Sequence, residues 1–368
     1  MFVTPEFESL RSAVAGATEA DVRRALESIR PGERDLAALL SPAAEPFLAA
    51  MASRSAAATG QRFGKTIQIY APLYVSNLCA NRCLYCGFSA ENRIDRRALS
   101  LDEAEAEAVL LQKRGFNHLL LVSGEAPAVG VEYLEALALR LRDRFAAISI
   151  EVQPLETEGY ARLFRAGITG VAVYQETYDR VTYGRMHPAG PKSDYVYRLA
   201  TPARGAAAGL REVGIGFLLG LSDWRAEGLA VGLHLAWLRK AFWRTAFTVS
   251  FPRMRPAAGG FQPPQPVNER QLTQLLFALR IFDPDLGLVL STREDARYRD
   301  GMIGLGPTRY SAGSCTAPGG YGSPDGSAGE QFSVGDHRSI DEVCAAIRAK
   351  GFDPVRKDWD AVFQQTAA

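Results

Sequence analysis

The chain has 368 residues, of which 47% are hydrophobic and 23% are charged. This balance is typical of globular proteins with a large core, and it excludes disordered and collagen-like chains. Lys plus Arg number 42 and Asp plus Glu number 41, so the net charge of +1 lacks the basic excess of nucleic-acid-binding proteins. The sequence contains no apolar run of about 20 residues and opens without the apolar segment of a signal peptide. We therefore expect a cytoplasmic protein that binds neither nucleic acid nor membrane.

The first part of the chain, residues 1–60, predicts a helical extension. Ala-rich stretches at residues 23–29 and 35–51 carry apolar side chains at spacings of three and four.

From Thr66 onward, short apolar runs alternate with amphipathic stretches, which is the pattern of a parallel α/β protein. The predicted strands are residues 67–74, 118–123, 148–153, 170–175, 213–220, 247–251, 286–291 and 309–313. Eight such units favour a (βα)8 TIM-type barrel over an open sheet, and we assign it to residues 61–313.

Helix boundaries between these strands support the assignment. Ser100 and Glu103 form the S-x-x-E pattern of a capping box, which begins a helix. Gly115, Gly167 and Gly214 each stand where a glycine that ends a helix is expected, immediately before a strand.

The remaining residues, 314–368, are expected to close the barrel as a C-terminal lid and tail. Residues 313–337 are rich in Gly, Ser and Pro without periodicity, and long loops of this kind in compact proteins are often lids. Residues 340–350 return to a helical pattern.

Polar residues follow the predicted strands at one end. In TIM-type barrels the active site lies at the C-terminal ends of the strands. The polar residues found there are Tyr74, Ser123, Glu125, Glu151, Gln153, Gln175, Glu176, Arg253, Arg293 and Ser311. Each could instead be a solvated loop residue, but their agreement over seven strand ends predicts a site at this rim.

Cys79, Cys83 and Cys86 form a C-x3-C-x2-C loop after the first predicted strand. Three thiolates on a short loop can bind a [4Fe-4S] cluster and leave one iron open, which is a catalytic feature. The alternative is a zinc site completed by Cys315 or Cys344, in a binding module without catalysis.

With Tyr85, this loop resembles the C-x3-C-x-aromatic-C motif of the radical S-adenosylmethionine (SAM) superfamily. Ser123-Gly124-Glu125 is similar to the Gly-Gly-Glu turn that receives the methionine amino group in that superfamily, with Ser in place of the first Gly. The resemblance implies that Glu151 and Glu176 contact SAM and that Arg198 binds its carboxylate. Without the cysteine loop, the two glutamates could be interpreted as a hydrolytic acid and base pair.

The resemblance extends over most of the chain and narrows to the 2-iminoacetate synthase family of thiamine thiazole synthesis. The similar segments are residues 74–94, 119–125, 151–155, 173–178, 220–225, 250–256, 290–294, 318–321 and 357–360. The family implies a lyase that cleaves the Cα–Cβ bond of L-tyrosine to 2-iminoacetate and p-cresol, while SAM yields methionine and 5′-deoxyadenosine. It also implies that Arg293 binds the substrate carboxylate, with Tyr74 and Ser311 as further substrate contacts.

The same resemblance implies two protein partners, a flavodoxin- or ferredoxin-type electron donor and the thiazole synthase that consumes the product. Arg93, Arg96 and Arg97 could dock the donor or form a solvated surface. His187 could assist proton transfer or be an ordinary loop histidine.

Two related lyases remain as alternatives. Tryptophan lyase differs in its amino acid, and the tyrosine lyase of hydrogenase maturation adds a C-terminal cysteine triplet. Here only Cys315 and Cys344 follow the cysteine loop.

Overall fold

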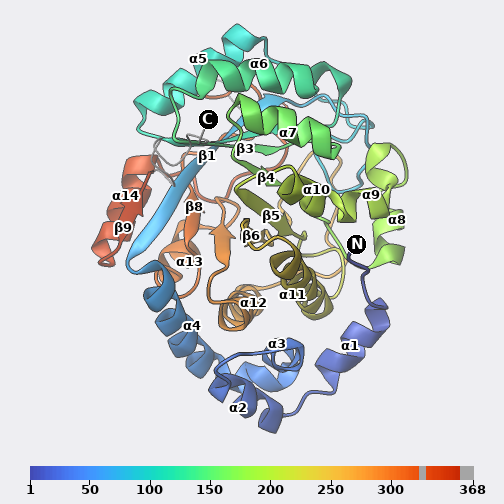
Figure 1. The fold of residues 1–368 in the computed structure, drawn as a ribbon, viewed down its shortest axis with the longest axis vertical. Helices are drawn as coiled ribbons and strands as arrows, with labels where there is room; N and C mark the ends of the chain where they lie inside the picture. Colours follow the sequence, from blue (N-terminus) through green and yellow to red (C-terminus); the bar gives the residue numbers. More distant parts are fainter. Residues whose placement is uncertain (323–328, 357–368) are drawn as a thin grey trace.

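The computed structural model describes residues 1–322 and 329–356, and its centre is a closed barrel of parallel strands (Figure 1). The strands are β1 (Thr66–Ser76), β2 (His118–Ser123), β3 (Ala147–Glu151), β4 (Gly170–Ala172), β5 (Glu212–Gly216), β6 (Ala246–Ser250), β7 (Gly287–Leu290) and β8 (Arg309–Ser311). Each strand pairs with the next along the chain, and β8 and β2 both pair with β1, so the sheet closes on itself. The predicted eight-stranded barrel is confirmed.

A ninth strand, β9 (Asp353–Val355), was not predicted. It pairs in parallel with Thr66–Gln68, the start of β1, after helix α14 (Ile340–Ala349). With three residues, one of them Pro354, β9 is too short to show an alternating pattern. The helix predicted at residues 340–350 is confirmed.

The longest strand, β1, shows how the barrel divides its side chains. Ile67, Ile69 and Leu73 belong to the main hydrophobic core with the surrounding helices. Tyr70 and Tyr74, which alternate with them, line pockets inside the barrel. Because successive side chains of a strand point to opposite faces, one strand serves both the core and the site.

Helices cover the outside of the barrel (Figure 1). In chain order they are α5 (Leu101–Lys113), η2 (Pro127–Val129), α6 (Val131–Leu141), α7 (Thr157–Ala166), α8 (Arg180–Met186), η3 (Pro191–Ser193), α9 (Tyr195–Leu199), α10 (Thr201–Ala207), α11 (Trp224–Ala241), α12 (Glu269–Phe282) and α13 (Ala296–Gly301).

The predicted capping box is present at α5, where the Glu103 amide donates to Ser100 Oγ at 3.2 Å and the Ser100 amide donates to Glu103 Oε2 at 2.8 Å. Gly115 and Gly167 have φ of 89° and 116°, as expected of glycines that end helices. The prediction for Gly214 is wrong, because Gly214 lies inside β5. The glycine with positive φ after α10 is Gly209, at 93°, three residues before the strand begins.

The N-terminal extension consists of α1 (Phe7–Ala15), α2 (Glu19–Glu27), α3 (Glu33–Leu40), η1 (Pro42–Phe47) and α4 (Leu48–Phe63). These helices form a belt along the part of the barrel covered by α11 and α12 (Figure 1). Gly232 of α11 permits close packing, since a Cβ there would lie 2.2 Å from Leu36 Cδ2 of α3.

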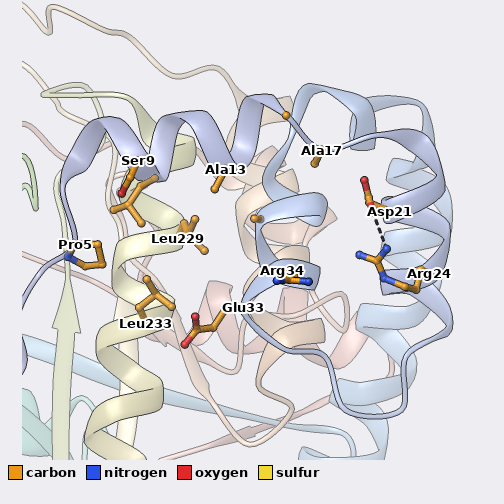
Figure 2. A pocket seen from close by; sticks show the side chains of 13 residues that line it. Pro5, Ser9, Ala13, Ala17, Asp21, Arg24, Glu33, Arg34, Leu229 and Leu233 are labelled. Atoms are coloured by element: carbon orange, nitrogen blue, oxygen red, sulfur yellow. Dashed lines mark hydrogen bonds and ion pairs between the residues drawn. The ribbon is translucent and has the colours of Figure 1, made fainter.

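A crevice lies between α1, α3 and α11, outside the barrel. Figure 2 shows Leu229 and Leu233 of α11 facing α1 across this crevice, with the ion pair of Asp21 and Arg24 at its other end. None of the residues that the sequence predicts for the site lines it.

Within the described residues, no single helix has the length and apolarity to span a membrane. A pair formed by Glu33–Leu40 and Pro42–Phe63 meets the criterion by length and composition alone, and it is bent by 80°.

Two predicted features fall partly or wholly outside the described residues. Residues 323–328 belong to the predicted lid, and residues 357–360 were one of the segments that carried the family resemblance. The described part of the predicted lid includes residues 329–336, which lie at the barrel mouth as set out below.

Candidate active site

The cysteine loop begins where β1 leaves the barrel. The pairing of β1 with β2 shifts register between Tyr74 and Ser76, and the chain then turns into the loop. The loop is held by Arg96, whose guanidinium donates to the carbonyl oxygens of Asn77, Phe88, Ser89 and Asn92. Arg96 is therefore a structural residue of the loop, whereas Arg93 and Arg97 are exposed.

All three cysteines of the loop line one pocket at the C-terminal ends of the first strands. The other lining residues include Ser123, Gly124, Glu125, Glu151, Tyr174, Glu176, Lys192, Arg198 and Gln331. The cofactor residues that the sequence predicts at the ends of β2 and β3, after β4 and on α9 are thus brought together around the cysteines, whereas Tyr85 does not line this pocket.

The three thiols share one pocket and need a metal to lose their protons. Burial raises the pKa of Cys83 to about 12, and nearby Lys192 partly offsets this effect, so a bound metal must displace the proton. Among the described residues, no three His, Cys, Asp or Glu side chains are close enough together to hold a single metal ion. In a [4Fe-4S] cluster each cysteine binds a different iron, so the three thiols need not meet at one ion.

Cys315 and Cys344 do not line this pocket. Cys344 is buried in the main core on α14, and Cys315 Sγ lies 3.8 Å from the carbonyl oxygen of Ala317. The structure therefore gives no support to the zinc alternative.

The turn after β2 faces the cysteines closely. A Cβ on Gly124 would lie 2.3 Å from the carbonyl oxygen of Leu78 and 2.9 Å from Cys79 Cβ, so only glycine fits. On either side, Ser123 Oγ and Glu125 Oε2 are buried and have no hydrogen-bond partner among the described residues. Buried polar atoms are costly without partners, and this pair suits a bound amino group.

Two cations and two carboxylates form a network across the pocket. Lys192 Nζ donates to Glu176 Oε1 at 2.6 Å, and Arg198 Nη1 donates to Glu125 Oε1 at 3.0 Å. Arg198 Nη2 lies 3.7 Å from Glu176 Oε1. Burial alone would raise the pKa of Glu176, but Lys192 and Arg198 outweigh it and lower the pKa, so Glu176 is ionised.

Glu176 has an unusual backbone. Its φ is 70°, in the left-handed region that non-glycine residues rarely adopt. The chain here continues past β4, where the amide of Leu218 donates to the carbonyl oxygen of Glu176 at 2.8 Å. Strain of this kind persists where the surrounding structure directs a side chain into a site.

Tyr85 is fixed by His187, which is buried at the end of α8. The Tyr183 carbonyl can only accept a hydrogen bond, so His187 Nδ1 donates to it at 2.8 Å and Nε2 accepts from the Tyr85 hydroxyl at 2.8 Å. Burial lowers the pKa of His187 to about 3, with Lys192 adding to the effect. His187 is thus a buried, neutral residue directly after α8 that orients Tyr85.

A second pocket contains the predicted substrate residues Tyr74, Arg293 and Ser311. The guanidinium of Arg293 lies over the Phe332 ring, 3.4 Å from its centre. The Tyr74 hydroxyl donates to Gln331 Oε1 at 2.8 Å. Ser311 Oγ accepts from the Thr292 amide at 2.9 Å and so braces the residue before Arg293.

The two pockets adjoin, since Val122, Glu151, Tyr174 and Gln331 line both. Burial raises the pKa of Glu151 to about 7, and Glu176 adds to this rise while Arg293 and Lys192 oppose it. The cysteine end and the arginine end therefore form one site with Glu151 at the junction.

Other polar residues at the predicted rim are engaged elsewhere. Gln153 Nε2 donates to the Val129 carbonyl at 2.9 Å, Gln175 Nε2 donates to the Tyr195 carbonyl at 3.3 Å, and Arg253 pairs with Glu294.

Four site residues were not singled out from the sequence: Tyr174, Lys192, Gln331 and Phe332. Tyr174 stands in a segment that carried the resemblance, and alternation in the strand places it inside the barrel. Lys192 lies in the one-turn η3, and Gln331 and Phe332 lie in an irregular segment, so no sequence pattern indicates which way these side chains point.

Comparison with known proteins agrees with this geometry. The Radical SAM superfamily model matches residues 73–230, and the Biotin and Thiamin Synthesis associated domain matches residues 250–353. The chain is 46% identical to the 2-iminoacetate synthase of Escherichia coli (strain K12), over 97% of this chain and 95% of that one.

Two solved structures have the same fold over most of their length. The crystal structure of HydG, a maturase of the [FeFe]-hydrogenase, aligns with a TM-score of 0.88 at 32% identity, over 95% of this chain and 80% of that one. HydG from Carboxydothermus hydrogenoformans aligns with a TM-score of 0.85 at 31% identity, over 97% of this chain and 81% of that one.

Proposed function

The chain belongs to the 2-iminoacetate synthase family of radical SAM tyrosine lyases, and from this premise we propose how its two adjoining pockets divide the reaction. The reaction cleaves the Cα–Cβ bond of L-tyrosine to 2-iminoacetate and p-cresol, for the thiazole of thiamine. The observation that carries the proposal is that the pocket with three cysteines and the pocket with Arg293 share Glu151 and Tyr174 as walls.

The cysteine pocket is the cofactor end. Cys79, Cys83 and Cys86 would hold the [4Fe-4S] cluster of this family and leave one iron for SAM. When bound, the reduced cluster and SAM supply the 5′-deoxyadenosyl radical that takes a hydrogen atom from the amino group of tyrosine. Ser123, Gly124 and Glu125 would bind the methionine amino group, because two orphaned oxygens face that position.

The remaining cofactor contacts come from the charged network. Arg198 would bind the SAM carboxylate, while Glu176 and Glu151 would accept hydrogen bonds from the ribose or amino hydrogens. Tyr85, held by its hydrogen bond to His187, would pack against the cofactor from the loop. These residues bind and orient, since the cofactor carries out the difficult chemistry.

The second pocket is the tyrosine end. Arg293 presents a planar fork of N–H donors that suits a carboxylate, and its stacking on Phe332 limits the directions it can point. Tyr74 would contact the substrate from β1, and Ser311 would keep the Arg293 segment in place through Thr292. With its carboxylate on Arg293, tyrosine directs its amino group toward the junction at Glu151.

This positioning determines the outcome of the reaction. A radical reacts with whichever hydrogen is nearest, and a displacement of about 1 Å can cost on the order of a hundredfold in rate. The chain therefore acts by holding the amino hydrogen of tyrosine closer to the cofactor end than any carbon-bound hydrogen.

Family membership also supports a cytoplasmic location and the two expected protein partners. A flavodoxin- or ferredoxin-type protein would reduce the cluster, and thiazole synthase would take up 2-iminoacetate, which hydrolyses quickly in water. Exposed Arg93 and Arg97, which follow the cysteine loop, are candidates for contact with an acidic donor.

The test is anaerobic reconstitution with iron and sulfide, followed by SAM, dithionite and tyrosine, with products identified by mass spectrometry. We expect 5′-deoxyadenosine and p-cresol in equal amounts, with glyoxylate from hydrolysed 2-iminoacetate. Carbon monoxide and cyanide would instead indicate the chemistry of hydrogenase maturation, and turnover of tryptophan in place of tyrosine would indicate tryptophan lyase. Failure of iron-loaded protein to form either product would refute the proposal.

A further inference from the structure

Residues 329–336 form a strap that crosses the barrel mouth after β8. At one end, Asn77 Nδ2 donates to the carbonyl oxygen of Gly329 at 3.1 Å. At the other end, the amides of Gly335 and Asp336 donate to the carbonyl oxygen of Thr292 at 2.8 and 3.0 Å. The strap is therefore attached beside the cysteine loop at one end and beside Arg293 at the other.

Gln331 lies between these two attachments and lines both pockets. Its Oε1 accepts from the Tyr74 hydroxyl at 2.8 Å, and its Nε2 donates to Cys86 Sγ at 3.8 Å. A cluster-bound thiolate can only accept hydrogen bonds, so it requires the amide nitrogen on its side and leaves the amide oxygen for Tyr74.

The backbone of Gln331 is seated on the cysteine loop as well. Its carbonyl oxygen accepts from the Gly87 amide at 3.2 Å, and a Cβ on Gly87 would lie 2.4 Å from that oxygen. Gly87 directly follows the last cysteine of the loop. This contact permits little movement of Gln331 relative to Cys86.

The contact between Gln331 and Cys86 differs from the other amide contact to a cysteine of the loop. Asn81 Nδ2 donates to Cys79 Sγ at 3.7 Å, but Asn81 belongs to the same loop as its acceptor. Gln331 reaches Cys86 from 245 residues away and touches the predicted substrate residue Tyr74 with the same amide.

We propose that Gln331 is a positioning residue that links the cluster ligand Cys86 to Tyr74 in the tyrosine pocket. The proposal rests on the proposed function. A hydrogen bond from N–H to a cluster sulfur stabilises the reduced, more negative cluster and raises its reduction potential. The same amide orients Tyr74, so one side chain influences both electron uptake and the placement of tyrosine.

The experiment compares three variants with wild type after reconstitution. Gln331→Met removes both hydrogen bonds of the amide. Gln331→Glu removes the N–H donor to Cys86 but keeps an oxygen acceptor for the Tyr74 hydroxyl. Tyr74→Phe removes only the hydrogen bond between residues 74 and 331. The readouts are the midpoint potential of the cluster by electron paramagnetic resonance without tyrosine, the KM for tyrosine, and the ratio of 5′-deoxyadenosine to p-cresol.

We expect a more negative potential in both Gln331 variants and an unchanged potential in Tyr74→Phe. Gln331→Met should raise the KM for tyrosine and lower kcat/KM for p-cresol formation by about 10- to 100-fold, with excess 5′-deoxyadenosine. Gln331→Glu should raise the KM less than Gln331→Met. Glu330→Gln changes the adjacent strap side chain, which lines neither pocket, and should match wild type in all three readouts.

A wild-type potential in both Gln331 variants overturns the proposal, and so does a shifted potential with an unchanged KM in Gln331→Met. If Gln331→Met does not hold a cluster, Gln331→Glu provides the potential and Tyr74→Phe provides the KM for tyrosine. Failure of the proposed function is recognised separately, because wild type itself would then make no p-cresol.

Discussion

The two ends of the barrel both contain buried polar side chains. At the N-terminal ends of the strands, Arg309 pairs with Glu212 and donates to Gln68 Oε1 at 2.9 Å. Nearby, His118 Nε2 lies 3.1 Å from Ser149 Oγ. At the C-terminal ends, Lys192 and Arg198 pair with Glu176 and Glu125, but Ser123 Oγ and Glu125 Oε2 lack partners among the described residues. Both ends bury charge inside the same barrel. At the first end Arg309 and Glu212 satisfy one another, whereas at the second end two carboxylate or hydroxyl oxygens beside the charged network are left without a protein partner among the described residues.

This difference, together with the backbone at the second end, indicates which of the two charged clusters is the functional one. Buried polar atoms are nearly always hydrogen-bonded in folded proteins, so two neighbouring oxygens without partners in a pocket favour a bound group there. A glycine required by close backbone approach, Gly124, and a residue with strained backbone, Glu176, occur at the same end. We expect variants at the two ends to separate activity from stability.

The largest effect is expected from the cysteine loop. Cys83→Ala should abolish both 5′-deoxyadenosine and p-cresol, because two thiolates do not retain the cluster. Iron and sulfide content after reconstitution, read with the products, measures this effect. Cys315→Ala is the control and should keep its iron, whereas normal turnover by Cys83→Ala would show that the loop is not the cluster site.

The next effect concerns the tyrosine end alone. Arg293→Ala should keep its iron content but lose about 100-fold in kcat/KM for p-cresol, because a charge-assisted contact is lost and tyrosine is misplaced. Arg297→Ala removes an arginine whose side chain is 78% exposed on α13, and it should behave as wild type. Unchanged p-cresol formation by Arg293→Ala at saturating tyrosine would reject the assignment.

At the opposite end of the barrel, stability should change rather than chemistry. Arg309→Met leaves Glu212 without its buried partner and should lower the free energy of unfolding by about 3–5 kcal/mol. Urea unfolding of the iron-free protein measures this. Adding Glu212→Met should restore much of the loss, and the product ratio of the folded variants should stay at the wild-type value. A change in that ratio would contradict a purely structural role.

The smallest effect is a pH dependence of stability at the junction. Because burial raises the pKa of Glu151 to about 7, the folded protein binds this proton more tightly than the unfolded chain, whose glutamates titrate near 4.5. The stabilising contribution is therefore complete below pH 4.5 and is lost as the pH rises to 7. The side chain in Glu151→Gln stays neutral, so the free energy of unfolding of this variant minus that of wild type should be larger at pH 8 than at pH 5.

Urea unfolding of the iron-free wild type and Glu151→Gln at pH 5 and at pH 8 tests this pH dependence. Gln153→Met alters a nearby residue that does not titrate, and its difference from wild type should be the same at both values. An equal difference for Glu151→Gln at the two pH values would mean that Glu151 titrates normally in the folded protein.

The barrel and the cysteine pocket could be predicted because their signals are local. Apolar runs, the Ser100 capping box and the spacing of Cys79, Cys83 and Cys86 depend on residues within a few positions of one another. Gly214 was misassigned because helix ends and strand glycines look alike without knowledge of the neighbouring strand. In the structure Gly214 needs its small size beside Thr248 and Ala172.

The sequence by itself determined the alternation of strands and helices, the cluster-binding loop and, through its motifs, the reaction class. The tertiary structure decided which polar residues at the strand ends turn inward: Glu151 and Arg293 do, whereas Arg253 pairs with Glu294. It also brought Gln331 onto Cys86 and Lys192 onto Glu176. Such contacts join irregular segments to the barrel, where side-chain direction follows from packing and charge pairing in three dimensions and not from any sequence period.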